Sequence, residues 1–214
     1  MNSAVIVAGG TGSRMEGDIP KQFIKLKEEE VLSYSVTTFL NHPQIGEVVI
    51  VCHPDWIEHV KSKYPECIVT VGGERRQDSS LNGVMATSHK TEIVLIHDAA
   101  RPFVSETIIT DCLAVLENCD GSAPILDSPD SLIEWDGKST YRINRSEIKI
   151  VQTPQCFRKK LILKVLSVYI EGTDEIGMVL ETFPDSQLEF IKGSSLNNKI
   201  TTDLDLHYFN NLPD

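Results

Sequence analysis

Short runs of consecutive apolar residues alternate with amphipathic segments along most of the chain. The apolar runs predict strands at residues 4–8, 47–52, 68–71, 92–97, 122–126 and 188–191. Segments with helical spacing predict helices at 32–40, 55–63, 79–87, 105–117, 161–170, 174–182 and 203–210, with Asp55 and Ser105 as N-terminal caps. Because continuous apolar strands are typical of parallel sheets covered on both faces, we expect an α/β fold with a doubly wound, mostly parallel, Rossmann-like sheet.

One stretch breaks this alternation. Residues 127–150 contain Pro129, Gly137, polar clusters and short alternating runs such as SLIEW and TYRIN. Such a pattern is typical of a hairpin, so we expect a β-arm at about 127–150 that protrudes from the sheet. With 214 residues and no internal repeat, the chain is expected to form a single domain, 1–214, around one core.

Composition and charge narrow the partners and the compartment. The net charge of −11 argues against nucleic acid as the main partner. No apolar run approaches the roughly 20 residues of a membrane span, and the first residues lack the regions of a signal peptide. The five cysteines are scattered without a CxxC pair, a pattern that suits reduced thiols. We therefore expect a cytoplasmic protein with no nucleic-acid or membrane partner.

The segments that follow three of the predicted strands are the richest in Gly, Arg, Lys and Asp. They are residues 9–21, 72–79 and 98–102. In sheets of this kind, ligands bind beyond the carboxyl ends of the strands. Position and chemistry therefore agree on a ligand site at that edge of the sheet.

The first of these segments, AGGTGSRMEGDIPKQF, has the glycines of a phosphate-binding loop but fits neither familiar template. Met15 replaces the third glycine of a dinucleotide fingerprint, and Gly17-Asp18 stands where a P-loop has Gly-Lys. The glycines allow backbone N–H groups to approach an anion closely, and Pro20 fixes the backbone beside Lys21. The alternative interpretation is a glycine-rich turn with solvated charges.

The other two segments supply a carboxylate and a second glycine loop. Asp98, in HDAARP, would suit Mg²⁺, which favours carboxylate oxygens and bridges to phosphates; alternatively, it caps a turn and pairs with Arg101 on the surface. The loop GGERRQDSS can present backbone groups and the Ser79 hydroxyl to the edge of a cytosine, or it can be a turn before a capped helix. Near the C-terminus, Lys199 in SLNNKITTDLD is either a further cation of the site or a solvent-facing lysine.

Together these stretches resemble one family. In order, AGGTGSRM…PKQF, GGERRQDSS, HDAARPF, INRSEI…TPQCF, TDE and NNKIT are similar to the motifs of the 2-C-methyl-D-erythritol 4-phosphate cytidylyltransferases of the non-mevalonate isoprenoid pathway. The resemblance runs from about residue 4 to 203. It implies a nucleotidyltransferase sheet and an enzyme that transfers CMP from CTP to the polyol phosphate and releases pyrophosphate.

The resemblance also implies roles for individual residues. Arg14 and Lys21 would stabilise the charge that grows on the α-phosphate and the leaving group. Lys199 would hold the α-phosphate and the nucleophile in line. Asp98 would bind Mg²⁺ and help to orient the polyol, with Arg101 nearby. The residues that would hold CTP are Ala8, Gly9, Gly10, Gly12, Gly73, Ser79, Asp98 and Ala99.

In this family the arm completes the site of a second subunit. By resemblance, Arg145 in INRSEI is the catalytic arm arginine that binds the polyol phosphate across a homodimer. Thr153 of TPQ and Thr173, which precedes Asp174, would contact the same substrate. The resemblance therefore implies a homodimer with two shared active sites.

Three other functions stay open. A ribitol-5-phosphate or other pentitol-phosphate cytidylyltransferase shares the CTP machinery, and Ala100 and INRSEI favour the methylerythritol enzyme over it. The region ILDSPDSLIEW, where Asp130-Ser131 is the nearest match to an Asp-Thr pair of the family, departs from the family pattern. Met15 disfavours a nicotinamide-dependent oxidoreductase. A nucleotide-sensing module without catalysis is disfavoured by the joint presence of Arg14, Lys21, Asp98 and Lys199.

Overall fold

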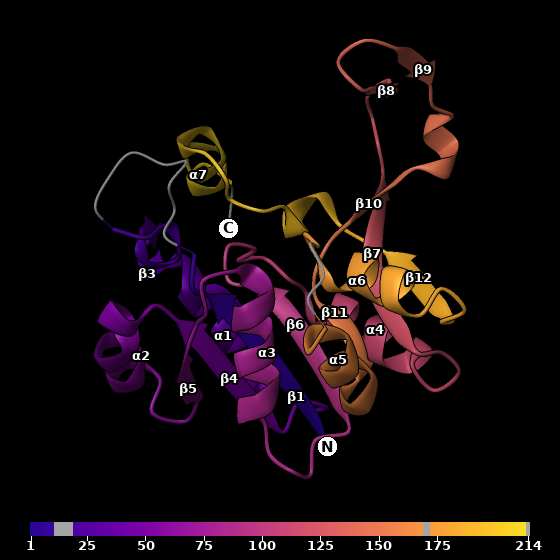
Figure 1. Ribbon diagram of the computed structural model, residues 1–214. Coiled ribbons are helices and arrows are strands. Elements are labelled where there is room, and N and C mark those ends of the chain that lie inside the picture. The colour runs from indigo at the N-terminus through magenta and orange to yellow at the C-terminus, as the bar shows by residue number, and fades with distance from the viewer. Residues whose placement is uncertain (11–18, 169–171, 213–214) are drawn as a thin grey trace.

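A single mixed sheet forms the centre of the molecule (Figure 1). The computed structural model describes residues 1–10, 19–168 and 172–212. Within these ranges the sheet has eight strands in the order β10-β7-β11-β6-β1-β4-β5, with β12 also paired to β7. The strands are β1 (Asn2–Ala8), β4 (Glu47–Cys52), β5 (Ile68–Val71), β6 (Ile93–Asp98), β7 (Gly121–Asp127), β10 (Lys149–Val151), β11 (Gln155–Arg158) and β12 (Leu188–Lys192).

The prediction of a mostly parallel sheet is confirmed. β1 pairs in parallel with β4 and β6, β4 with β5, and β7 with β12. β11 runs antiparallel between β6 and β7, and β10 runs antiparallel to β7. The sequence pattern did not predict β11. Because it runs in the opposite direction, the residues before β11, and not those after it, reach the edge where β6 ends.

Helices cover both faces of the sheet, because successive strand residues point to opposite sides. Ile6 belongs to one core cluster, with side chains of α1, α2 and α4, whereas its neighbour Val5 belongs to another, with side chains of α3, α5 and α6. This arrangement confirms the doubly wound prediction. The helices are α1 (Val31–Asn41), α2 (Ile57–Lys63), α3 (Arg76–Ala86), α4 (Glu106–Val115), α5 (Lys159–Leu166), α6 (Glu175–Thr182) and α7 (Asp203–Asn210). Among the helices of the described residues, none combines the length and the apolar character that crossing a membrane requires.

The helix caps were predicted with mixed success. Ser105 caps α4 as expected, because its Oγ accepts the N–H of Ile108 at 3.2 Å. The prediction that Asp55 caps the second helix is wrong. Pro54–Trp56 forms a 3-10 turn before α2, and His53 accepts the N–H of Asp55. Proline is pre-organised for the first position of a helical turn, so the chain starts to turn before Asp55 can act as a cap.

Two other helices differ from the pattern at their ends. The third helix begins at Arg76 and not near Ser79, and its first turn therefore includes residues that were assigned to a loop. The fifth begins at Lys159 and ends at Leu166, whereas the pattern predicted 161–170, of which 169 and 170 lie outside the described residues. These shifts matter for the site, because the start of α3 decides which arginine of GGERRQDSS reaches Asp98.

Helix α3 lies unusually close to the sheet at Gly83. A methyl group at this position would lie 2.3 Å from Cγ1 of Val5 and 2.7 Å from Cγ2 of Val51. Real side-chain carbons do not approach so closely, so glycine is required for this contact. The close packing fixes the distance of α3 from β1 and β4. It thereby also fixes the position of the residues in the first turn of α3.

A small third cluster joins the segment around Leu26 to the C-terminal helix α7. The short strands β2 (Lys25–Leu26) and β3 (Glu29–Glu30) pair with each other. Leu26 packs with Phe209 of α7 and with Ile200. The segment that contains Lys21 therefore lies beside the segment that contains Lys199.

Residues 128–148, here called the hairpin segment, lie between β7 and β10. They contain β8 (Ile133–Trp135) paired antiparallel with β9 (Thr140–Arg142), and Figure 1 shows them away from the sheet at the upper right. Nearly all of the segment is exposed, including Ile133, Trp135 and Tyr141. In this chain these apolar side chains are therefore open to solvent.

Candidate active site

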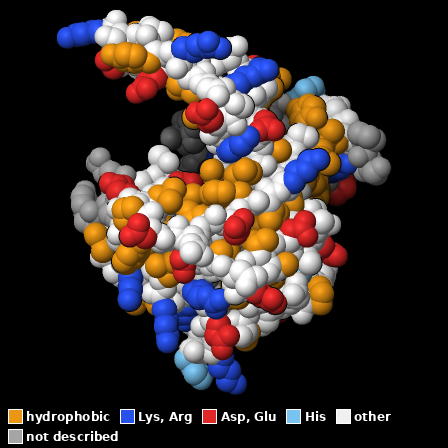
Figure 2. All heavy atoms as spheres, turned by 90° about the vertical axis from the view of Figure 1, so that its right-hand side faces the viewer, with side chains coloured by type: hydrophobic (Ala, Val, Ile, Leu, Met, Phe, Trp, Pro, Cys, Tyr) orange, Lys and Arg blue, Asp and Glu red, His pale blue; other side chains and the backbone are white. Residues whose placement is uncertain are grey.

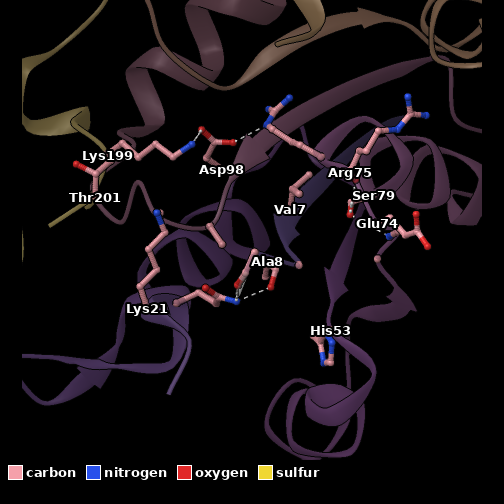
Figure 3. Close-up of a pocket in the computed structure, with 18 of the residues that line it drawn as sticks. Val7, Ala8, Lys21, His53, Glu74, Arg75, Ser79, Asp98, Lys199 and Thr201 are labelled. Carbon is pink, nitrogen blue, oxygen red and sulfur yellow. Dashed lines mark hydrogen bonds and ion pairs between the residues drawn. The ribbon is translucent and has the colours of Figure 1, made fainter. Parts of the chain in front are cut away.

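A cleft of about 660 Å³ opens at the carboxyl ends of the central parallel strands (Figure 3). This is the edge where the sequence predicted a ligand site. The lining residues include Val7, Ala8, Gly9, Gly10, Lys21, Gln22, His53, Gly72, Gly73, Glu74, Arg75, Arg76, Ser79, Asp98, Ala99, Lys199 and Thr201. The structure thus brings together most of the residues that were expected to hold CTP. Gly12 and Arg14, which were predicted for the same site, lie outside the described residues.

Gln22 fixes the start of the glycine loop. Its side-chain amide is buried and donates to the carbonyl oxygens of Ala8 at 2.6 Å and Gly10 at 2.9 Å. A buried amide that satisfies two backbone acceptors holds that backbone in place. A methyl group at Gly10 would meet no described residue within 4 Å. The backbone at the start of the loop is therefore held in place, and no described residue crowds Gly10.

The second glycine loop is organised by Ser79. Its Oγ accepts the N–H of Gly73 at 3.0 Å and donates to the carbonyl of Arg75 at 3.2 Å. The same oxygen would lie 3.2 Å and 3.0 Å from methyl groups at Gly9 and Gly72. The two glycine loops therefore approach each other across this hydroxyl, and both contribute backbone to the wall of the cleft.

Two lysines enter the cleft from the same side (Figure 3). Nζ of Lys21 donates to the carbonyl of Ile200 at 3.0 Å, and Nζ of Lys199 donates to Oδ2 of Asp98 at 2.9 Å. Lys199 and Ile200 are consecutive, so one backbone segment positions both ammonium groups. Positive charge gathered at one point of an acidic protein favours a polyanionic ligand there.

Asp98, at the end of β6, is surrounded by three cations. Its Oδ1 accepts from Nε of Arg76 at 3.1 Å, and its Oδ2 lies 2.9 Å from Lys199 and 3.6 Å from Nε of Arg101. Burial alone would raise the pKa of this carboxyl, but the charges of Arg76, Lys199 and Arg101 outweigh it and hold the pKa well below its usual range. Asp98 is therefore ionised throughout the working pH range.

The donor set at Asp98 fits one kind of metal site. Among the described residues there is no group of three or more His, Cys, Asp or Glu side chains that could hold a metal ion. Mg²⁺ bound with nucleotides needs only one or two carboxylates, because phosphate oxygens and water supply the remaining ligands. A single ionised carboxylate that lines a cleft together with several cations fits a Mg²⁺ ion that arrives with its phosphates. It does not fit an all-protein metal site.

A second cavity, of about 310 Å³, adjoins the cleft. It shares Arg76, Asp98 and Lys199 with the cleft, so these three side chains stand where the two spaces meet. Its other lining residues are Arg101, Val151, Thr153, Gln155, Thr173 and Asp174. The structure therefore gathers Arg101, Thr153 and Thr173, which the sequence had assigned to the second substrate. Arginine, threonine and lysine side chains around one space can bind a phosphate and hydroxyl groups.

A buried histidine organises the floor of the second cavity. Nε2 of His97 lies 3.0 Å from the carbonyl oxygen of Arg101, and Nδ1 lies 2.9 Å from Oγ1 of Thr153. The carbonyl can only accept, so Nε2 carries the proton and Nδ1 accepts from the Thr153 hydroxyl. Oγ1 of Thr153 in turn accepts the N–H of Asp98 at 3.1 Å. Burial lowers the pKa of His97 to about 4, which keeps it neutral in this role.

Arg145 is a predicted site residue that lies away from both cavities in this chain. It lies on the exposed hairpin segment, donates from Nη1 to the carbonyl of Pro129 at 3.1 Å, and lines neither cavity. Any contact with a polyol phosphate must therefore come from another copy of the chain or from a movement of the segment.

Sequence reasoning missed several residues that the structure places at the site. Gln22 stands in the quoted PKQF motif, and Arg76 in GGERRQDSS, but neither was singled out. Glu175, in TDE, is fully buried and pairs with Arg76 at 2.7 Å. Adjacent arginines and a helix-start acidic residue were visible signals, but their directions depend on where α3 and α6 begin.

Comparison with known proteins places these observations in context. A family described as 2-C-methyl-D-erythritol 4-phosphate cytidylyltransferase matches residues 2–211. The chain is 38% identical over 217 residues to the protein of that name from Clostridium botulinum (strain 657 / Type Ba4), covering 96% of this chain and 94% of the relative. It is 32% identical over 220 residues to a bifunctional ribulose 5-phosphate reductase/CDP-ribitol pyrophosphorylase from Haemophilus influenzae, covering 96% of this chain and 46% of that protein. The crystal structure of 4-diphosphocytidyl-2C-methyl-D-erythritolsynthase from Anaerococcus prevotii DSM 20548 is similar with a TM-score of 0.88 and 26% identity, covering 98% of this chain and 94% of that one.

Proposed function

The chain belongs to the 2-C-methyl-D-erythritol 4-phosphate cytidylyltransferase family, and from this we infer that it transfers CMP from CTP to 2-C-methyl-D-erythritol 4-phosphate in isoprenoid biosynthesis. One observation supports this function above the others. A cleft with two glycine loops and a second cavity meet at Arg76, Asp98 and Lys199. Two anionic substrates can therefore occupy neighbouring spaces and share cations at their boundary.

The roles of the residues follow from what the reaction demands. The attacking phosphate oxygen is already anionic, so the protein must align two polyanions and stabilise the charge that develops on the α-phosphate and on pyrophosphate. We assign this stabilisation to Arg14 and Lys21, and the alignment to Lys199. Backbone groups of Ala8, Gly9, Gly10, Gly12, Gly73 and Ala99, with the Ser79 hydroxyl, hold CTP in this assignment.

Arg101, Thr153 and Thr173 line the second cavity, and we assign them to the polyol phosphate. His97, as a neutral imidazole, accepts from the Thr153 hydroxyl and so fixes its direction. In the proposed site Asp98 is the carboxylate that would hold Mg²⁺. When bound, the ion supplies charge neutralisation on the phosphates.

A homodimer is part of the proposal. Figure 2 shows the hairpin segment overhanging a hollow, with hydrophobic side chains gathered on the adjoining face. Ile150 on β10 and Phe190 on β12, at this end of the sheet, are exposed, as are Ile133 and Trp135 on the hairpin segment. A second copy would cover these side chains and would bring its own Arg145 to the second cavity. Free thiols on all five cysteines support the proposed cytoplasmic location.

The runner-up substrate is ribitol 5-phosphate or another pentitol phosphate. The similarity to the Haemophilus influenzae protein that is named for CDP-ribitol synthesis favours keeping this candidate. Both reactions use the same nucleotide cleft and differ only in what the second cavity accepts. The oxidoreductase alternative has no support, since the family that the chain matches is one of nucleotidyl transfer.

Pyrophosphate release distinguishes these candidates. Purified protein is incubated with CTP and Mg²⁺ and with either 2-C-methyl-D-erythritol 4-phosphate or ribitol 5-phosphate. We expect release with the methylerythritol compound at a kcat/KM far above that with ribitol 5-phosphate. The reverse preference would move the assignment to the runner-up, and no release with either would contradict cytidylyl transfer.

A further inference from the structure

Arg76 stands in the wall between the two cavities, at the point where the reacting groups would meet. Its Nε donates to Asp98 at 3.1 Å and its Nη1 donates to Glu175 at 2.7 Å. Its Nη2 makes no hydrogen bond to a described residue. The guanidinium is therefore held on two sides and retains donor capacity toward the boundary of the cavities.

Glu175, the first residue of α6, is fully buried. Its Oε1 accepts from Arg76 and from Oγ of Ser80, both at 2.7 Å, whereas the buried Oε2 has no hydrogen-bond partner among the described residues. Burying a carboxylate is costly unless it is paired with a cation. Arg76 is the cation that the structure pairs with Glu175, so this ion pair holds the Arg76 guanidinium in place.

The start of α6, which carries Glu175, is itself fixed to the sheet. Nε2 of Gln155 on β11 donates to Oδ2 of Asp174 at 3.0 Å, and Oε1 of Gln155 accepts the N–H of Ile176 at 2.8 Å. Oδ1 of Asp174 accepts the N–H of Gly177 and caps α6. Three contacts thus fix the backbone on both sides of Glu175, and the carboxylate is a rigid anchor.

Glu175 also affects how closely Arg76 approaches Asp98. Arg76, Lys199 and Arg101 all lie near its two carboxylate oxygens. Burial would lower the pKa of Arg76, but Glu175 and Asp98 together raise it, so its charge is permanent. Without Glu175, Arg76 would be free to swing fully onto Asp98 and away from the boundary. With Glu175, it stays between the two carboxylates.

We propose that Arg76 is a further phosphate-binding residue of the reaction, acting where the nucleotide and the polyol phosphate meet, and that Glu175 is the positioning residue that aims it. The proposal rests on the proposed function, because it names a contact of the same site. It assigns the Glu of the TDE stretch to the reaction through an ion pair with α3, in addition to the threonine that precedes it by two residues.

A double-mutant cycle tests the proposal. The variants are Arg76→Ala, Glu175→Gln and the double variant, with Glu181→Gln as a control that removes an exposed charge from the same helix. Arg76→Ala should lower kcat/KM about 10²- to 10³-fold. Glu175→Gln keeps the shape of the side chain and should lower kcat/KM on the order of 10-fold with the melting temperature nearly unchanged. In the Arg76→Ala background the same change should have less than about a 2-fold effect.

A merely structural role for Glu175 gives a different pattern. It would lower the melting temperature and would reduce kcat/KM by the same factor whether or not Arg76 is present. That result, or near-normal kcat/KM for Arg76→Ala, would overturn the proposal. If Glu175→Gln does not fold, Arg76→Lys decides, because it keeps the charge but loses the fork that reaches both carboxylates; near-normal kcat/KM there would also overturn it.

Calorimetric binding of CTP separates this proposal from the proposed function, because it needs no turnover. Arg76→Ala should weaken CTP binding on the order of 10-fold, and the Glu181→Gln control should leave it unchanged. If the wild-type protein binds CTP but transfers CMP to neither polyol phosphate, the proposed function fails while the Arg76 contact is still measured. If the wild-type enzyme is active and Arg76→Ala changes neither affinity nor kcat/KM, only the present inference fails.

Discussion

The hydroxyl of Thr153 donates to Nδ1 of His97 across 2.9 Å, inside the protein beneath the second cavity. The bond requires a neutral imidazole, because a protonated ring could not accept it. A residue that lines the cavity is therefore coupled to the protonation state of one that substrate does not touch.

Lowering the pH should destabilise the protein through His97. Its pKa is about 4 in the folded state, against about 6.5 in an unfolded chain. Between these values the unfolded chain binds a proton and the folded chain does not, so the free energy of unfolding falls as the pH falls. The loss between pH 7.5 and 5 is on the order of 2 kcal/mol. Asp98, whose pKa is lowered from 3.8, loses its contribution only at more acidic pH.

Urea unfolding at pH 7.5 and 5 measures this loss. The His97→Gln variant should show a smaller difference between the two pH values than the wild-type protein. The matched control is His89→Gln, at an exposed position, which should keep the wild-type difference. Equal pH dependence in the wild-type and His97→Gln proteins would contradict the assignment.

Two glycine-to-alanine changes should separate stability from binding. Gly83→Ala places a methyl group against Val5 and Val51 and should cost about 1–3 kcal/mol of unfolding free energy. Gly10→Ala meets no described residue within 4 Å and should change stability by less than about 0.5 kcal/mol. It should instead raise the KM for CTP. Denaturant unfolding and steady-state kinetics on both variants check the pair, and a stability loss in Gly10→Ala alone would reverse the interpretation.

Lys21→Ala should remove turnover without unfolding the protein. Its ammonium group is aimed into the cleft by the Ile200 carbonyl, and loss of one such cation typically lowers the rate about 10²- to 10³-fold. Lys25→Ala, at an exposed position shortly after it, is the control and should retain wild-type kcat. Pyrophosphate release and a melting curve are measured for both. Near-normal kcat in Lys21→Ala would remove it from the transition-state assignment.

Chelation tests the proposed metal. Treatment with EDTA should abolish pyrophosphate release, and added Mg²⁺ should restore it. Asp98→Asn should not be rescued by Mg²⁺ concentrations that saturate the wild-type enzyme, because the ionised ligand is gone. Asp111→Asn, on the exposed side of α4, should respond to Mg²⁺ as the wild-type does. Undiminished turnover in EDTA would exclude a required divalent ion.

Mixed subunits test the proposed sharing of the active site. Lys21→Ala and Arg145→Ala homodimers are both expected to be inactive. After subunit exchange, one site of each hybrid should contain an intact Lys21 and the partner subunit's intact hairpin segment, so part of the activity should return. Absence of recovery, with exchange verified by mass spectrometry of the mixed dimer, would count against sharing of Arg145.

The apolar pattern predicted the main parallel strands and the helices that cover them, because each of these elements is long enough to show its period. It missed β11, a four-residue strand in which only Cys156 and Phe157 are apolar. The reversed direction of that strand is a tertiary property that no local pattern encodes. The cap of α2 was misplaced because a proline starts the turn one position earlier than Asp55.

The site was predictable where its residues follow parallel strands. Gly9, Gly73 and Asp98 lie at strand ends, and the topology then brings them together. The pairing of Asp98 with Lys199 joins residues separated by 101 positions, and spacing cannot reveal it. The direction of Arg76 depends on α3 starting at that residue, since Arg75 next to it turns to Asp78 instead. The position of each arginine relative to the start of the helix, and not its residue type, decides which carboxylate it pairs with.

The two cavities also draw their lining from different parts of the chain. Except for Lys199 and Thr201, the residues that line the nucleotide cleft all precede α4, whereas Thr153, Gln155, Thr173 and Asp174 of the second cavity follow it. A single genetic crossover between β6 and α4 would therefore keep most of the residues that line the cleft and replace most of those that line the second cavity. Under the proposed function, recombination of this kind would join one CTP cleft to cavities for different sugar alcohols, and Lys199 and Thr201 are the residues of the cleft that it would also exchange.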